Sequence, residues 1–222
     1  MKRCILLVAA AATLAHGQLA ENANAGYRTR EGRENVARTL SSPDRAERLQ
    51  AETLMKLLEL KPGMVVADIG TGVGAMLPFL SKAVQPGGRI YAEDIFPDFL
   101  ERAKAKVETG KIPAVTFVAG TEKDPQLPEG CCDLAFTVDV YHHFDYPVEM
   151  LAGIRRALKP NGRFVIVDFY RRPDAMGNGN FALQHIRIDR DEVIKEVESS
   201  GMKLLLKQDH VPEKQYILIF GK

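Results

Sequence analysis

The segment from Val65 to Gly74 constrains the fold of this 222-residue chain more than any other part of it. It is an apolar run of strand length that contains one acid, Asp68, and ends in three alternating glycines. Such a run predicts a buried parallel strand that turns sharply into a helix, because only glycine lets the backbone turn so tightly and approach a ligand. Amides at the start of that helix favour an anionic group, whereas the Asp68 carboxylate favours a nearby ammonium or ribose hydroxyls. The segment therefore predicts a nucleotide-type pocket.

The glycine spacing by itself leaves the ligand open. Gly70, Gly72 and Ala75 also satisfy the dinucleotide fingerprint, with alanine in its third place. A nicotinamide-dependent (NAD) Rossmann oxidoreductase is therefore an alternative that this segment permits.

Composition favours one α/β domain and excludes several kinds of partner. A hydrophobic content of 45% in a chain of this length is enough for a buried core. The formal net charge of +1 provides no excess of either sign, so neither nucleic acid nor an anionic membrane is expected as a partner. The sequence contains no internal repeat and no low-complexity stretch, and it does not indicate an oligomeric state.

Residues 1–17 have the pattern of a secretory signal peptide. Two basic residues precede an apolar run from Ile5 to Ala15, and Ala15-His16-Gly17 offers a small-residue cleavage pattern before Gln18. The run is too short to span a bilayer comfortably, so we expect no stable membrane anchor. We therefore expect an exported protein, periplasmic or secreted, with a cytoplasmic one as the alternative. Residues 18–41 are then an N-terminal extension or lid.

The cysteines do not predict a disulfide framework. Cys4 leaves with the signal peptide, and adjacent cysteines rarely form a bridge without strain. We expect Cys131 and Cys132 to be two reduced thiols at the start of a strand.

Strand and helix signals alternate through the rest of the chain. Strands are predicted at residues 64–69, 89–95, 114–119, 133–138 and 163–169. Helices are predicted from Ser42-Pro43-Asp44, with Leu49, Thr53, Leu54, Leu57 and Leu58 on one face, then through Leu77 and Leu80, from Pro97, from Pro147, and over 191–200. Such alternation predicts a mostly parallel sheet with helices on both faces. The link between the last two strands, 202–207 and 215–220, is too short for a parallel crossover, so they form an antiparallel hairpin at or near the sheet edge.

Four segments, in this order, resemble the class I S-adenosylmethionine-dependent methyltransferases. They are Asp68–Gly74, Tyr91–Ile95, Leu127–Gly130 leading into Asp133–Phe136, and Ala157–Arg163. The resemblance covers residues 42–222, taken as one methyltransferase domain. It implies a Rossmann-like, seven-stranded, mostly parallel sheet with helices on both faces and a C-terminal antiparallel hairpin. It also implies S-adenosyl-L-methionine as cofactor and methyl transfer to an unidentified small-molecule acceptor.

The resemblance assigns residues to the methionine end of the cofactor. Gly70, Thr71, Gly72 and Gly74 form the turn against it, and Asp68 lies near its amino group.

The resemblance places Asp94 on the ribose hydroxyls. An acid about twenty residues beyond the glycines independently fits this role in a Rossmann-type crevice. Strand alternation lets only one of Glu93 and Asp94 face the crevice, and the family register favours Asp94.

The same resemblance places Ile95 against the adenine. The family's aspartate position near the adenine amino group is Thr121 here, so Glu122 or Asp124 is expected to supply that contact. Asp139, after the fourth strand, completes the expected cofactor set.

Candidate catalytic residues follow the fourth strand, at the carboxyl end of the sheet where the ligand crevice lies. Methyl transfer is an in-line displacement whose barrier is lowered mainly by positioning, so a dedicated catalytic residue is optional. A histidine at this place could remove a proton from the acceptor, and we choose His142, with Tyr141 beside it. In the alternative interpretation these residues cap helices and line the cofactor pocket.

Gln184-His185-Ile186-Arg187 lies between the fifth strand and the last helix. This region often covers the acceptor site in the family, so the resemblance makes His185 and Arg187 substrate contacts, with a solvated loop as the alternative. His142, His143 and His185 have no ligand spacing in the sequence, so no metal is expected. A non-catalytic S-adenosylmethionine-binding protein is a further functional alternative.

Overall fold

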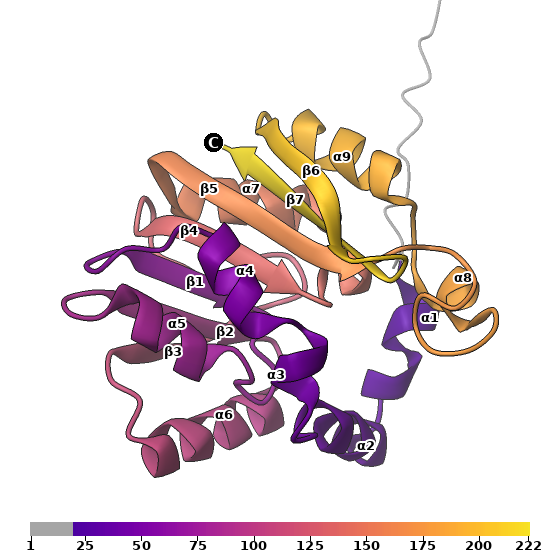
Figure 1. Ribbon diagram of the computed structural model, residues 1–222, viewed down its shortest axis with the longest axis horizontal. Helices are drawn as coiled ribbons and strands as arrows, with labels where there is room; N and C mark the ends of the chain where they lie inside the picture. The colour runs from indigo at the N-terminus through magenta and orange to yellow at the C-terminus, as the bar shows by residue number, and fades with distance from the viewer. Residues whose placement is uncertain (1–19) are drawn as a thin grey trace, which may run out of the picture.

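The computed structural model describes residues 20–222, so the predicted signal peptide lies outside the described residues. A seven-stranded sheet with the order β3-β2-β1-β4-β5-β7-β6 forms its centre (Figure 1). The strands are β1 (Val65–Ile69), β2 (Arg89–Asp94), β3 (Val115–Ala119), β4 (Cys132–Val138), β5 (Leu158–Phe169), β6 (Lys203–Val211) and β7 (Gln215–Gly221). The helices are α1 (Glu21–Asn24), η1 (Ala25–Tyr27), α2 (Arg30–Leu40), α3 (Arg45–Arg48), α4 (Ala51–Leu57), α5 (Leu77–Val84), α6 (Pro97–Gly110), η2 (Tyr141–His143), α7 (Pro147–Ala157), α8 (Phe181–His185) and α9 (Arg190–Ser199).

Pairing in the sheet confirms the predicted fold class. Strands β1 to β5 pair in parallel, and β7 runs antiparallel between β5 and β6. Only residues 212–214 separate β6 from β7, which is far too short for a crossover helix. The terminal hairpin therefore puts β6 at the sheet edge, as the link length predicts.

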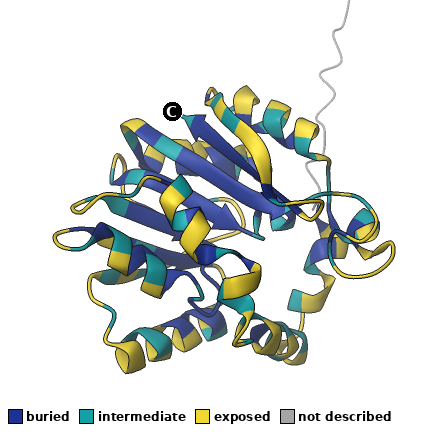
Figure 2. Ribbon diagram, viewed as in Figure 1, coloured by how far each residue is buried: buried dark blue, intermediate teal, exposed yellow. Residues whose placement is uncertain are grey.

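Helices cover both faces of the sheet because the central strands bury side chains on both sides. In β1, Ala67 and Ile69 pack into a core cluster with α7 and α9, whereas Val66 packs into a second cluster with α4, α5 and α6. The central strands are accordingly almost wholly buried, and the helices expose only their outer faces (Figure 2). Burial on both faces explains why the sequences of these strands are mostly apolar and do not alternate between apolar and polar residues.

The segment after Ser42 corrects one expectation. We predicted one helix there, but Gln50 adopts a left-handed conformation, with φ of 45°, and separates α3 from α4. Leu54 and Leu58 are buried as expected, whereas Thr53 is exposed.

The N-terminal segment, residues 20–41, forms α1, η1 and α2 beside the carboxyl ends of the strands. Helix α1 lies against α8 (Figure 1). Two hydrogen bonds to the Asp145 carboxylate attach its beginning, from the Ala20 amide at 2.8 Å and from the Asn24 side chain at 2.9 Å. The segment is thus joined to the loop that follows β4.

Two further features bear on the sequence expectations. Cys131 and Cys132, at the start of β4, are free cysteines. Across residues 20–222, no helix has the length and apolarity that crossing a bilayer would require.

Candidate cofactor site

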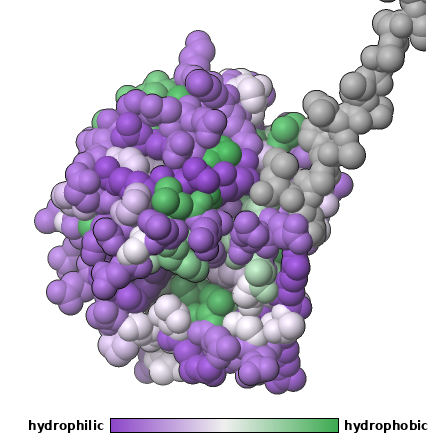
Figure 3. Space-filling model, turned by 90° about the vertical axis from the view of Figure 1, so that its right-hand side faces the viewer, coloured by the Kyte–Doolittle hydropathy of each residue, from purple (hydrophilic) through white to green (hydrophobic). Residues whose placement is uncertain are grey.

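A cavity of about 310 Å³ lies at the carboxyl ends of β1, β2 and β4, a size within the range of small-molecule sites. The face on this side of the molecule is hollowed, with hydrophobic residues in the hollow (Figure 3). Most of the predicted cofactor residues line the cavity: Asp68, Gly70, Thr71, Gly72, Asp94, Ile95, Glu122 and Asp139. Gly74 does not line it.

The glycine turn after β1 needs glycine for two separate reasons. Gly70 and Gly72 have φ of 69° and 55°, a left-handed conformation that costs other residues free energy. A Cβ at Gly70 would also lie 2.6 Å from Val140 Cγ1, so the turn and the loop after β4 are in close contact. A Cβ at Gly74 would lie 2.8 Å from Leu77 Cδ1, which makes Gly74 a packing residue against α5.

Three buried acids surround this turn, and we name Asp68, Glu93 and Asp94 the acid cluster. Asp68, 3% exposed, accepts a hydrogen bond of 2.7 Å from the Thr71 hydroxyl. Glu93 accepts one of 3.2 Å from the Gly70 amide. Asp94 accepts one of 2.9 Å from the Gly72 amide and another of 2.9 Å from the amide of Phe96. The carboxylates therefore hold the glycine turn in shape.

Burial dominates the electrostatics of the acid cluster. It raises the pKa of Asp68 to about 7 and that of Asp94 to about 6, and it raises the pKa of Glu93 well above its usual value. Repulsion by Asp94 raises the pKa of Asp68 and of Glu93 further. Within residues 20–222 the hydrogen-bond donors to these acids are backbone amides and one hydroxyl, and Glu93 Oε1 is buried without a partner. The cluster thus fits a ligand with a positive charge and hydroxyl donors.

The expectation that only one of two neighbouring acids faces the crevice is wrong, because both Glu93 and Asp94 line the cavity. Asp94 is the last residue of β2, where the chain leaves the sheet, and its carboxylate turns toward Gly72 and Phe96. The longer side chain of Glu93 reaches the Gly70 amide from the neighbouring position. Strand alternation therefore does not separate the two side chains at this strand end.

The outer part of the cavity contains the residues predicted near the adenine. Ile95 is 36% exposed and Glu122 is exposed, and both line the cavity. Asp124, the alternative to Glu122, instead binds Arg156 with contacts of 2.9 and 3.0 Å. Of the two acids, only Glu122 therefore lies where it can contact a ligand in this cavity.

Asp139 lines the cavity, and each of its carboxylate oxygens accepts a hydrogen bond from another side chain. Arg45 donates to one oxygen at 2.8 Å, and Gln215 donates to the other at 2.5 Å. Asp139 itself has φ of 58°. This residue therefore joins α3 to β7, a contact that the sequence did not indicate.

Aromatic and polar groups of the N-terminal segment cover the cavity. The ring of Tyr27 stacks on Phe96 with a centroid distance of 5.6 Å and meets the edge of His143 at 4.9 Å. Burial, together with the charge of Asp94, raises the pKa of Tyr27 to about 12, so its hydroxyl stays protonated. Asn24 donates to the His143 carbonyl oxygen at 3.0 Å. Sequence reasoning did not assign these residues a role beyond an extension or lid.

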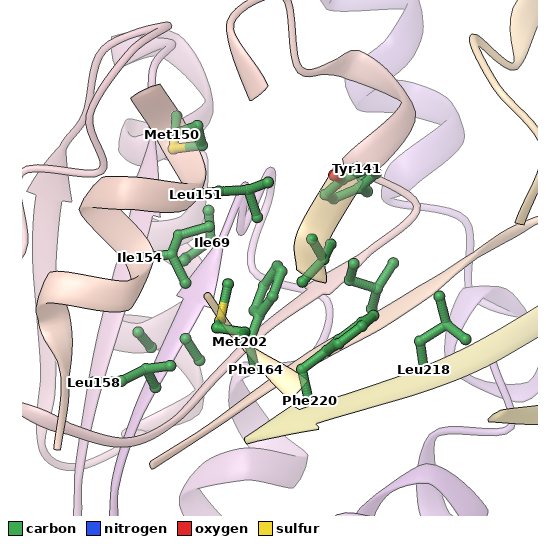
Figure 4. Packing of buried hydrophobic residues seen from close by; sticks show 14 of the residues in the cluster. Ile69, Tyr141, Met150, Leu151, Ile154, Leu158, Phe164, Met202, Leu218 and Phe220 are labelled. Atoms are coloured by element: carbon green, nitrogen blue, oxygen red, sulfur yellow. The ribbon is translucent and has the colours of Figure 1, made fainter. Parts of the chain in front are cut away.

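Tyr141 and Arg187 do not reach the cavity, which corrects two expected site residues. The Tyr141 hydroxyl donates to Glu196 at 3.0 Å, and its ring lies in the core cluster beside α7 (Figure 4). Arg187, whose side chain is 7% exposed, donates to the same carboxylate at 3.1 and 2.6 Å. Glu196 lies on α9, so these two residues form a structural network there. Their sequence positions gave no signal of a shared partner.

His142 is buried beside the cavity and is oriented by an acid in β5. Its Nδ1 lies 2.7 Å from Asp168 Oδ1, and its amide donates to the other oxygen at 2.9 Å. Asp168 is 1% exposed, and an acid inside the apolar run of β5 was the available signal for it.

The histidines at 142, 143 and 185 form one cluster, although their sequence spacing predicts no metal ligands. Burial lowers the pKa of His143 well below its usual value and that of His185 to about 4. These two rings are therefore uncharged at neutral pH. His185 does not line the cavity but adjoins His143, which does.

Known proteins resemble both the sequence and the fold. A family model described as a methyltransferase domain matches residues 67–166. An uncharacterized methyltransferase of Synechocystis sp. is 33% identical over 117 residues, 51% of this chain and 51% of that protein. An S-adenosyl-L-methionine-dependent Diels-Alderase of Talaromyces variabilis is 33% identical over 135 residues, 60% of this chain and 45% of that protein. A SAM-dependent methyltransferase structure from Aquifex aeolicus has a TM-score of 0.77 at 26% identity, covering 84% of this chain and 97% of that one.

Residues 67–166 therefore contain a methyltransferase domain, and the fold is that of the class I S-adenosylmethionine-dependent methyltransferases, whose cofactor is S-adenosylmethionine. The chain spans about half or less of the length of these two curated relatives. Neither the family match nor the relatives support the nicotinamide alternative.

Proposed function

We propose that this protein transfers the methyl group of S-adenosylmethionine to a small-molecule acceptor. The acid cluster at the glycine turn is the observation that carries the proposal, because it places three buried carboxyl groups at the wall of the cavity, where a cationic ligand would favour their ionised form. When bound, the cofactor supplies an electrophilic methyl group on a positively charged sulfur. The chain's own contribution is to hold the cofactor's ammonium and ribose and to orient the acceptor for in-line attack.

The shape of the cavity supports a small acceptor. Residues of α1, η1 and α2 line it together with the glycine turn, so the acceptor has to share this cavity with the N-terminal segment. Asn24, Tyr27, His143 and Asp145 place polar groups there. Such a mixed polar and aromatic surface suits a compact acceptor with a hydroxyl, thiol or amine group.

Cofactor binding and methyl transfer are tested separately. Isothermal titration with S-adenosylhomocysteine reports binding, and methyl-labelled S-adenosylmethionine with panels of phenols, thiols and amines reports transfer to a product heavier by one methyl group. Gly70→Ala is the matched variant, because its Cβ would occupy the space beside Val140 and block the turn. Absence of binding at millimolar cofactor would refute the proposal.

A second candidate function is cofactor-dependent chemistry without methyl transfer. The similarity to a protein named as an S-adenosyl-L-methionine-dependent Diels-Alderase favours including it. Tight binding of the cofactor with no methylated product in any acceptor panel is the result that would favour this candidate over a transferase.

We also propose that residues 1–17 direct export. Cleavage after Gly17 would leave the contact between the Ala20 amide and Asp145 intact, so a processed chain keeps the attachment of its N-terminal segment. Amino-terminal sequencing of protein recovered from a secreting host tests this: a start at Gln18 supports export, and an intact Met1 in the cytoplasm refutes it.

A further inference from the structure

Three histidines from two separate segments meet beside the cofactor cavity. His142 and His143 belong to η2, and His185 is the last residue of α8. One ring nitrogen of each lies within 4.8 Å of the corresponding atoms of the other two. The ring centroids are 4.0 Å apart for His142 and His143, 5.1 Å for His142 and His185, and 5.5 Å for His143 and His185. No carboxylate belongs to this group of atoms within residues 20–222.

His142 presents a nitrogen that has no partner. Its Nδ1 lies 2.7 Å from a carboxylate oxygen of Asp168, which can only accept, so Nδ1 carries the hydrogen. The lone pair is then on Nε2, which is buried and without a hydrogen-bond partner in the described chain. A carboxylate behind a histidine is the arrangement that orients metal-bound imidazoles and increases their basicity.

Asn24 orients His143 much as Asp168 orients His142, with an oxygen acceptor next to Nδ1. The Asn24 amide nitrogen donates to Asp145 at 2.9 Å and to the His143 carbonyl oxygen at 3.0 Å, so its oxygen is the atom that faces the ring. This oxygen lies 2.8 Å from His143 Nδ1 and therefore accepts from it. The lone pair of His143 is thus on Nε2, where the Tyr27 hydroxyl is a distant neighbour at 3.5 Å.

We propose that His142, His143 and His185 bind one divalent transition-metal ion of the zinc class. Imidazole nitrogens suit zinc, copper, iron and nickel, whereas magnesium and calcium need the oxygen ligands that this group lacks. Three protein ligands with an open position are typical of zinc sites that act on a bound molecule rather than of structural ones. Because His143 lines the cofactor cavity, the ion lies at the cavity wall.

The chemical use of the ion rests on the proposed function. A hydroxyl or thiol of the acceptor that occupies the open position loses its proton to water more readily. Its lone pair then forms the new bond to the methyl carbon while the carbon–sulfur bond breaks and leaves its electron pair on sulfur. The acceptor class is therefore one with a metal-binding oxygen or sulfur.

The experiment titrates Zn²⁺, and Co²⁺ as a spectroscopic probe, into the untagged full chain after chelator treatment and without cofactor. His185→Ala is the main variant, because α8 is a short surface helix and His185 is only partly buried. His210→Gln is the matched control, since this histidine instead hydrogen-bonds the Leu49 carbonyl oxygen at 2.8 Å. Asp168→Asn tests orientation of His142. Circular dichroism verifies that each variant is folded.

We expect one ion per chain, a visible absorption band of nitrogen-coordinated Co²⁺, and metal affinity lower by at least ten-fold in His185→Ala. For Asp168→Asn we expect a loss of about 10- to 100-fold, the range for residues behind a metal ligand. Unchanged affinity in His185→Ala, or an equal loss in His210→Gln, would overturn the proposal. Titration of S-adenosylhomocysteine on the same samples keeps the two proposals distinct, because metal binding without cofactor binding refutes only the proposed function.

Discussion

Asp68→Asn tests the physical basis of the cofactor site, and it should make the cofactor-free protein more stable at neutral pH. Burial raises the pKa of Asp68 from 3.8 to about 7. Between these values the folded protein holds a proton that the unfolded chain has released, so the Asp68 contribution to stability falls as pH rises. A shift of about 3 units corresponds to about 4 kcal/mol in total.

Roughly 2–3 kcal/mol of that loss falls between pH 5 and pH 8, because the unfolded carboxyl is already mostly ionised at pH 5. Asparagine has a similar shape, can still accept the Thr71 hydrogen bond and never ionises. The free energy of unfolding of wild type relative to Asp68→Asn should therefore fall by this amount between the two pH values. Urea unfolding followed by circular dichroism measures it, with exposed Glu108→Gln on α6 as the control.

The same substitution should weaken binding of the cofactor. Loss of a charged acceptor for the cofactor's ammonium costs about 1.5–3 kcal/mol, or roughly 10- to 100-fold in affinity at pH 8. Calorimetric titration with S-adenosylhomocysteine measures this. Two results would refute this reasoning: an identical pH dependence of stability in wild type and Asp68→Asn, or an unchanged cofactor affinity. Either would show that Asp68 is not a buried carboxyl group that lacks a cationic partner until the cofactor binds.

Three further predictions follow from the same geometry. Cofactor binding at pH 6 should release protons from Asp68 and Asp94, whose pKa values are raised to about 7 and about 6, because the bound cation favours the ionised acids; calorimetry in two buffers of different ionisation enthalpy should detect a release from these two groups that falls as the pH rises above about 7. Gly70→Ala should destabilise the protein by about 1–3 kcal/mol, from left-handed strain and contact with Val140, and an unchanged melting temperature would contradict this. Asp145→Ala removes the acceptor for Ala20 and Asn24, so trypsin should cleave the N-terminal segment several-fold faster; an unchanged cleavage rate would show that other contacts hold it.

Local signals predicted the positions of residues near the glycine turn but not all of their partners. The turn, Asp68 and Asp94 were predicted because their roles depend on residues nearby in sequence and on strand ends that parallel pairing brings to one edge. The expectation that only one of Glu93 and Asp94 faces the crevice was wrong, since the alternation rule holds within a strand and fails at its last residue. Tyr141 was misplaced because its partner, Glu196, lies 55 residues away on α9.

The sequence by itself determined the order of strands and helices, the terminal hairpin and the glycine turn, because each depends on side-chain periodicity, link length or backbone freedom within a few residues. Only the tertiary structure decided that both acids at the end of β2 line the cavity, that Arg187 pairs with Glu196, and that His185 meets His142. The contacts of Arg187 and His185 depend on the path of the segment between β5 and α9. No local pattern encodes that path, because it follows from burial shared among distant residues.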